Sequence, residues 1–270
     1  FLEGQMHALR LTDNITKAKG LYNATKNSSL YDKKLKMYKV TAPLGKMPEE
    51  IGRCRVFTPG WLENESIWLH MEYKYLLEIL KSGLYEEFYN DFKNVLIPFQ
   101  DPARYGRNIL ENSSFIVSSA YPDQSLWGKG FVARLSGVTV ELLDIWIVMC
   151  LGKKPFSIDK DNNLCIKFSP ILKADLFTQK QQTIAYNGKR VILEKNSFAF
   201  KLFSWILVVY HNPTRKDTFT NDARIEKIEV IEGGKKHTFN SNTIAAPLSY
   251  AVRDLKVERI DVYFEQMIHK

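Results

Sequence analysis

The spacing of apolar residues changes partway along the chain, and this change limits the fold more than any other feature. In the first part, apolar side chains recur at helical intervals, as in residues 71–84 and 85–96. In the second part, short alternating runs rich in β-branched and aromatic residues are separated by turn signals such as Asn187-Gly188. The pattern predicts an α+β protein in which a helical region precedes a β region, with the junction near Lys153.

Five segments of the first region have a helical pattern. The last of them is apolar on nearly every side, so we expect a helix that is buried all round and ends at Gly152. Two long connections, residues 39–69 and 101–135, separate the helices, and loops of this length in a compact domain usually carry function. The predicted helices cover residues 2–11, 18–30, 71–84, 85–96 and 138–151.

Eight runs in the second region have the length and composition of strands, which favours an antiparallel, jelly-roll-like β-sandwich. We therefore predict two domains, a helical one over residues 1–152 and a β-sandwich over residues 153–270. The predicted strands cover residues 164–168, 183–186, 190–194, 198–203, 206–211, 225–231, 236–239 and 259–264.

Composition excludes several classes of protein. The three cysteines are too few and too scattered for a disulfide framework or a zinc module, and we expect no metal and no cofactor. The longest apolar stretches fall well short of the roughly 20 residues that cross a bilayer, so we expect no membrane partner. Residues 153–270 hold most of the net charge of +8, with 20 Lys and Arg against 13 Asp and Glu. These charges are spread over strands and turns, so we expect a solvated surface and no nucleic-acid partner.

The first residue is a bulky Phe1 with no signal peptide before it. We therefore expect that the chain is cut from a longer, cytoplasmic protein and that it is inactive alone.

The densest group of polar and aromatic side chains lies in residues 57–70. Aromatic faces beside carboxylates and amides suit a sugar, which has apolar faces and a rim of hydroxyl groups. Core packing at the start of a helix would give the same residues, so both interpretations stay open. The members of this group are Trp61, Glu63, Asn64, Trp68 and His70.

Two further segments offer polar groups. Residues 106–131 include Glu111 and several serines around Tyr121 and Trp127, and this is either a binding loop or an ordinary surface loop. Ser136-Gly137 stands directly before the apolar helix, where a hydroxyl and free backbone N–H groups suit an anion, although Ser136 also suits a plain N-cap. The chain has no GxSxG nucleophile elbow and no phosphate-binding glycine loop.

The order of these motifs resembles that of a known family, the cellobiose and chitobiose phosphorylases, which are inverting glycoside phosphorylases. Residues 48–52, 58–64 and 67–70 resemble the family pattern EIG…PPGYKENGGVFCH, and residues 134–146 resemble its WLTGTAAW helix entry. Residues 164–172 (LCIKFSPIL) and 208–213 (VVYHNP) are similar to its LRVDPCIP and ITVKNP strands. The identities are patchy, as in a divergent relative.

The resemblance implies the last helices of an (α/α)6 barrel followed by the family's C-terminal β-sandwich. It implies that phosphate is held by His70, Ser136 and Gly137, because these match the family's His and Thr-Gly. It also implies a sugar site, with Glu63 and Glu111 at acidic positions of the family, beside the candidate contacts Trp61, Asn64 and Trp68.

The chain departs from the family in two respects. The family's general acid is an Asp in a DWND-type motif, which is absent here, so we expect the catalytic acid upstream of Phe1. Met71-Glu72 replaces Thr-Asn after His70, so we expect a negative charge beside the anion site.

We therefore expect inverting phosphorolysis of a β-linked glucan or disaccharide, with inorganic phosphate as co-substrate and a possible homodimer of the full-length enzyme. One alternative is an inverting hydrolase that uses water and two carboxyl groups. Others are a non-catalytic carbohydrate-binding fragment and a basic module that binds acidic polymers.

Overall fold

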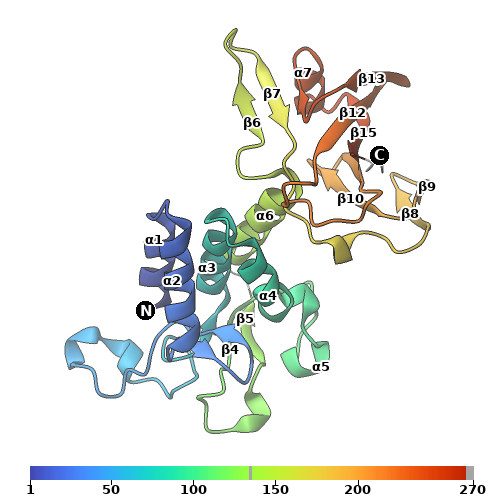
Figure 1. The fold of residues 1–270 in the computed structure, drawn as a ribbon. Helices are drawn as coiled ribbons and strands as arrows, with labels where there is room; N and C mark the ends of the chain where they lie inside the picture. Colours follow the sequence, from blue (N-terminus) through green and yellow to red (C-terminus); the bar gives the residue numbers. More distant parts are fainter. Residues whose placement is uncertain (134–135, 266–270) are drawn as a thin grey trace. The chain divides into compact units, whose positions relative to one another are not determined.

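The computed structural model describes residues 1–133 and 136–265 of the chain (Figure 1). Within these residues the fold is α+β, as the sequence predicts, with helices concentrated in the first part and strands in the second. The chain divides into two compact units, Phe1–Trp146 and Ile147–Lys270.

The five helices that the apolar spacing predicts are present, with ends within three residues of those expected, and the short α5 was not predicted. α3 packs against α1 and α4, and α1 also contacts α2. Leu76, Ile79 and Leu80 of α3 are fully buried together with Leu2 and Met6 of α1, which is the contact expected of two amphipathic faces. The helices are α1 (Leu2–Arg10), α2 (Ile15–Asn27), α3 (Leu69–Lys81), α4 (Tyr85–Val95), the short α5 (Pro102–Tyr105) and α6 (Ser136–Leu151).

A buried polar cluster joins α2, β2 (Met37–Tyr38) and α4. The Asp91 carboxylate of α4 is fully buried and accepts hydrogen bonds from Tyr22 (3.1 Å) and Tyr38 (2.5 Å), and it pairs with Lys26. Lys26 also lies over the ring of Tyr31, 4.1 Å from its centroid. A buried carboxylate is tolerated only when its oxygens are paired in this way, so the cluster fixes α2 against α4.

The long connections of the first unit contain a small antiparallel sheet that the sequence does not predict. Its strand order is β3-β4-β5, with strands β3 (Ile67–Trp68), β4 (Ser113–Ile116) and β5 (Gly130–Ala133). A separate hairpin joins β1 (Tyr31–Asp32) to β2. Because α3 begins at the residue after β3, the sheet fixes the first turn of α3.

α6 differs from the expectation of a helix buried all round. Val138, Ile145 and residues 148–151 are buried, whereas Val140 and Leu143 are more than half exposed. The expectation is therefore wrong for the side of α6 that carries Val140 and Leu143, because an apolar helix is buried only where neighbouring elements cover it.

In the second unit, all eight predicted strands are present with ends within two residues of those expected. β6, β14 and helix α7 (Leu248–Arg253) were not predicted, because they are short. The strands are β6 (Phe156–Ile158), β7 (Leu164–Lys167), β8 (Gln182–Tyr186), β9 (Lys189–Leu193), β10 (Ser197–Leu202), β11 (Ile206–His211), β12 (Ile225–Glu232), β13 (Lys235–Phe239), β14 (Thr243–Ile244) and β15 (Val257–Phe264).

The main sheet of this unit has the strand order β10-β11-β15-β12-β13, beside a three-stranded sheet β14-β7-β6 and the hairpin β8-β9. β11 and β15 run parallel, with Val208 paired to Ile260, while the other pairs are antiparallel. The expectation of an antiparallel architecture is therefore wrong for this one pair. The chain returns from β13 through β14 and α7, which lets β15 enter between β11 and β12 in the direction of β11.

The two faces of the main sheet differ as the period of a strand requires. Val208, Tyr210 and Ile260 on one face are fully buried. On the other face, the β8-β9 hairpin covers Leu207 and Val209 through Leu193, and the same face carries the polar side chains of Arg259 and Asp261.

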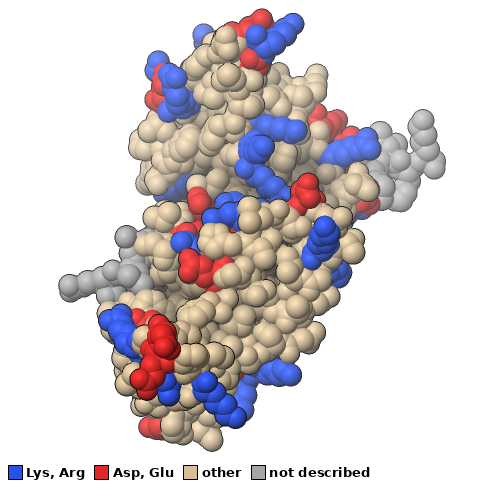
Figure 2. All heavy atoms as spheres, turned by 90° about the vertical axis from the view of Figure 1, so that its left-hand side faces the viewer, with Lys and Arg blue, Asp and Glu red and all other residues tan. Residues whose placement is uncertain are grey.

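Charged side chains of both signs share the molecular surface. On the face shown in Figure 2, Lys and Arg lie in small groups among Asp and Glu. In the part of the chain that the structure describes, no helix is long and apolar enough to cross a membrane.

Candidate functional site

The loop of residues 57–70 folds back on itself and ends in α3. Gly60 donates its N–H to the carbonyl of Asn64 (2.8 Å), and the Asn64 amide donates to the carbonyl of Phe57 (2.7 Å). Gly60 has φ +85°, and a Cβ there would lie 2.5 Å from the backbone nitrogen of Tyr121. Glycine is therefore required at this position both by its conformation and by the close approach.

The two tryptophans of this loop pack against the small sheet. The ring of Trp61 lies 5.1 Å from that of Phe115 and 4.8 Å from that of Phe131. Trp68 donates its indole N–H to the carbonyl of Leu62 (2.8 Å) and stacks on Phe115. These contacts correspond to the core-packing interpretation, and the half-buried rings leave only part of their surface to a sugar.

Glu63 and Asn64 have different surroundings. Glu63 pairs with Arg53 through one oxygen (2.8 Å), and its other oxygen is buried without a hydrogen-bond partner among the described residues. Asn64 is only 2% exposed, so its amide holds the loop from inside, and a sugar reaches it only if the loop opens.

Glu111 lies on the loop before β4 and pairs with Arg107. Its carbonyl accepts a hydrogen bond from Tyr105 (2.7 Å). The next residue, Asn112, reaches the hydroxyl of Thr139 in α6 (3.5 Å), so this loop borders the first turns of α6.

His70 and Gly137 lie in direct contact. His70 is the second residue of α3, and Gly137 is the second residue of α6. The imidazole is so close that a Cβ on Gly137 would lie 2.7 Å from its Cε1 and 2.8 Å from its Nε2. The first turns of two helices therefore meet at the imidazole, and their free N–H groups make this region favourable for an anion.

Ser136, the third residue of the expected anion site, begins α6. Its side chain lies outside the described residues, as do Arg134 and Leu135 before it.

Glu141 is a further member of this group that the sequence did not indicate. Its carboxylate lies 3.5 Å from His70 Nε2 and is 15% exposed, against 35% for the imidazole. The two form an ion pair when His70 is protonated. Glu141 follows Gly137 by one helical turn, and this i, i+4 spacing is the signal that could have identified it.

Glu72 does not supply the negative charge that we expected beside the anion site. It is fully buried, and it accepts a hydrogen bond from the backbone N–H of Tyr38 (2.7 Å). Burial raises the pKa of Glu72 well above the ordinary carboxyl value, which disfavours its charged form. The carboxylate that faces His70 is that of Glu141.

Among the described residues, no group of three or more His, Cys, Asp and Glu side chains is arranged to hold a metal ion. No sequence model of a known protein family matches the chain, and the comparison with curated proteins finds no similar sequence.

Proposed function

We propose that the chain is the C-terminal part of a carbohydrate-active enzyme that cleaves β-glycosidic bonds by inverting phosphorolysis of a β-glucan or a disaccharide. In this proposal it is a divergent relative of the cellobiose and chitobiose phosphorylases. The helices of the first unit are then the last helices of an (α/α)6 barrel, and the second unit corresponds to the family's jelly-roll-like sandwich.

The observation that carries the proposal is the contact between His70 and Gly137. The resemblance assigns both residues to one phosphate group, although they stand far apart in the sequence. Their contact therefore supports a shared role that local sequence spacing does not require.

The chemistry follows from these positions. Phosphate binds between the imidazole of His70 and the N–H groups at the start of α6, and the resemblance assigns Ser136 to the same phosphate. A phosphate oxygen attacks the anomeric carbon from the face opposite the leaving group, and the glycosidic C–O bond breaks. A carboxylic acid outside this chain gives its proton to the leaving oxygen, and the product is a sugar 1-phosphate with inverted configuration.

A second candidate function rests on Glu141. Its carboxylate lies 3.5 Å from His70 Nε2, where it competes with phosphate for the same imidazole. In an inverting hydrolase this carboxylate is the base that takes a proton from water.

The reaction products separate the two candidates. The full-length protein is incubated with cellobiose, with and without inorganic phosphate. Phosphate-dependent glucose 1-phosphate supports phosphorolysis, whereas two glucose molecules released without phosphate support hydrolysis. His70→Ala is expected to abolish the first activity, and His7→Ala, an exposed histidine of α1, serves as the matched control.

A phosphate titration of this chain labelled with 13Cε1-histidine tests the binding site directly. Phosphate is expected to shift the His70 signal. An unshifted His70 signal at saturating phosphate refutes the anion site, whatever the enzyme assay gives.

A further inference from the structure

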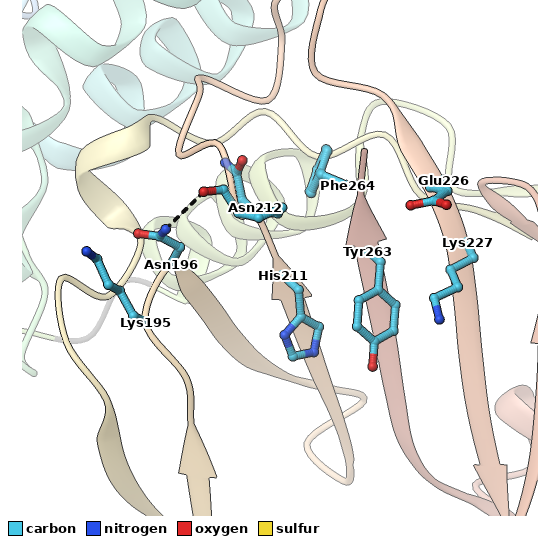
Figure 3. A pocket seen from close by; sticks show the side chains of 9 residues that line it. Lys195, Asn196, His211, Asn212, Glu226, Lys227, Tyr263 and Phe264 are labelled. Carbon is cyan, nitrogen blue, oxygen red and sulfur yellow. Dashed lines mark hydrogen bonds between the residues drawn. The ribbon is translucent and has the colours of Figure 1, made fainter. Parts of the chain in front are cut away.

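The second unit contains a polar pocket of about 520 Å³ that the proposed function does not use (Figure 3). The parallel strands β11 and β15 end there, and the antiparallel β12 begins there. Sheet order therefore brings the ends of these three strands, together with the turn before β10, to one end of the sheet. The lining residues are Lys195, Asn196, His211, Asn212, Pro213, Glu226, Lys227, Tyr263 and Phe264.

Three of these side chains form a row across the sheet. His211 is paired with Tyr263, and Tyr263 with Lys227, in the strand register. The imidazole and phenol rings are stacked, with centroids 4.5 Å apart and planes 11° apart. The Lys227 ammonium lies 4.6 Å from the centre of the Tyr263 ring. Figure 3 shows the three side chains projecting to the same side.

Asp261 fixes the row from beside it. It is 5% exposed, and its carboxylate accepts from His211 Nε2 (2.7 Å) and from two nitrogens of Arg259 (both 2.7 Å). Burial alone would raise the pKa of Asp261, but the hydrogen bonds from His211 and Arg259 lower it overall. An ionised carboxylate only accepts, so the Nε2 of His211 carries a proton. The imidazole is therefore held in one orientation.

The pocket offers both donors and acceptors to a ligand. The Lys195 ammonium makes no hydrogen bond and no ion pair with any described residue. The Glu226 carboxylate makes no hydrogen bond with any described residue. Asn196 donates to the carbonyl of Pro213 (3.1 Å, dashed in Figure 3), which leaves its amide oxygen buried without a partner in the described chain. A buried acceptor without a partner calls for a donor from a ligand or from water.

We propose that this pocket binds a neutral saccharide. A saccharide carries several hydroxyl groups, each of which donates and accepts, so one hydroxyl group can meet Lys195 and Asn196 while another meets Glu226. An anion would meet the carboxylate of Glu226 and the free oxygen of Asn196, and a cation would meet Lys195 and Lys227. The pocket has the size of a small-ligand site, and no reaction is assigned to it.

The test uses this chain labelled with 13Cε1-histidine and titrated with cellotetraose, a choice of probe that rests on the proposed function. Xylotetraose and chitotetraose are included so that the class of saccharide is tested apart from that function. The His211 signal is expected to shift, and the apparent dissociation constant is expected to be the same in low and high NaCl. The His70 signal of the same sample reports phosphate binding separately, so either proposal can fail alone.

Two variants assign the binding to the pocket. Lys195→Met removes a charged donor and is expected to weaken binding about tenfold, while Lys189→Met on the neighbouring hairpin leaves it unchanged. Glu226→Gln keeps an acceptor oxygen and is expected to weaken binding less than Lys195→Met.

Two results overturn the proposal. One is a His211 signal that none of the three saccharides shifts. The other is a salt-dependent shift caused by phosphate or tetragalacturonate, with tighter binding in Glu226→Gln, which identifies an anion site.

Discussion

Replacing Gly137 by alanine tests the contact on which the proposed function rests. The added Cβ would lie 2.7, 2.8 and 3.0 Å from three atoms of the His70 ring. Real Cβ atoms essentially never lie closer than 3.0 Å to such a neighbour. The imidazole must therefore move away from the start of α6. Its 3.5 Å contact with Glu141 changes at the same time.

Two opposing effects set the change in stability. Alanine favours a helix by up to about 1 kcal/mol over glycine, whereas overpacking costs about 1–3 kcal/mol. We expect a net loss of about 0–2 kcal/mol in the free energy of unfolding, measured by urea denaturation. A displaced imidazole also loses a charge-assisted hydrogen bond to phosphate of about 1.5–3 kcal/mol, so phosphate affinity is expected to fall about tenfold to a hundredfold.

Gly20→Ala is the matched control, because Gly20 lies inside α2 and a Cβ there meets nothing within 4 Å. It is expected to stabilise the chain by about 1 kcal/mol and to leave the His70 signal unchanged. The reasoning is refuted if Gly137→Ala binds phosphate as tightly as the wild type and keeps the wild-type His70 chemical shift.

Three other variants test the buried polar groups and the loop. The raised pKa of Glu72 means that its stabilising effect is complete below the unfolded carboxyl pKa near 4.5 and is lost as pH rises toward the folded value. Between these two pKa values, the free energy of unfolding of Glu72→Gln, measured by urea denaturation, is therefore expected to rise relative to that of the wild type by up to about 1.4 kcal/mol per pH unit. Asp91→Ala leaves Lys26 without its partner and is expected to lower the free energy of unfolding by about 3 kcal/mol. Gly60→Ala forces a Cβ against the backbone of Tyr121 and is expected to lower the melting temperature, with a loss of about 1–3 kcal/mol or more.

Each of these variants has a contrary outcome, and Gly60→Ala also has a matched control. A constant difference between Glu72→Gln and wild type at every pH would show that Glu72 does not titrate on unfolding. Gly45→Ala is the control for Gly60→Ala, because a Cβ at Gly45 meets nothing within 4 Å, and it should leave the melting temperature nearly unchanged. An equally small change in Gly60→Ala would contradict the close approach of Gly60 to Tyr121. If Asp91→Ala lowers the free energy of unfolding by less than about 1 kcal/mol, the Lys26 ammonium is solvated by water when its partner is removed.

The strands of the second unit could be predicted because each run either alternates between apolar and polar residues, as in residues 259–264 (RIDVYF), or is rich in β-branched and aromatic residues, as in residues 206–211 (ILVVYH). The position of β15 could not, because pairing between distant strands depends on how the whole sheet assembles. The short strands β3 and β4 also escaped prediction, since they are formed by pairing rather than by local propensity.

The candidate site shows the same division. The pairing of His70 with Gly137 was expected only from the resemblance, whereas Glu141 was missed although its spacing from Gly137 is helical. The negative charge expected at Glu72 was wrong because neighbouring residues of a helix point to different sides. The side chain of Glu72 points into the core.

The central position of β15 has a consequence for the order in which the second unit folds. The hairpins β10-β11 and β12-β13 join neighbouring segments and can form as soon as they leave the ribosome. β11 and β12 then present unpaired edges until residues 257–264 insert between them. Unpaired strand edges favour aggregation, so we expect the nascent chain to be prone to aggregation until β15 has inserted.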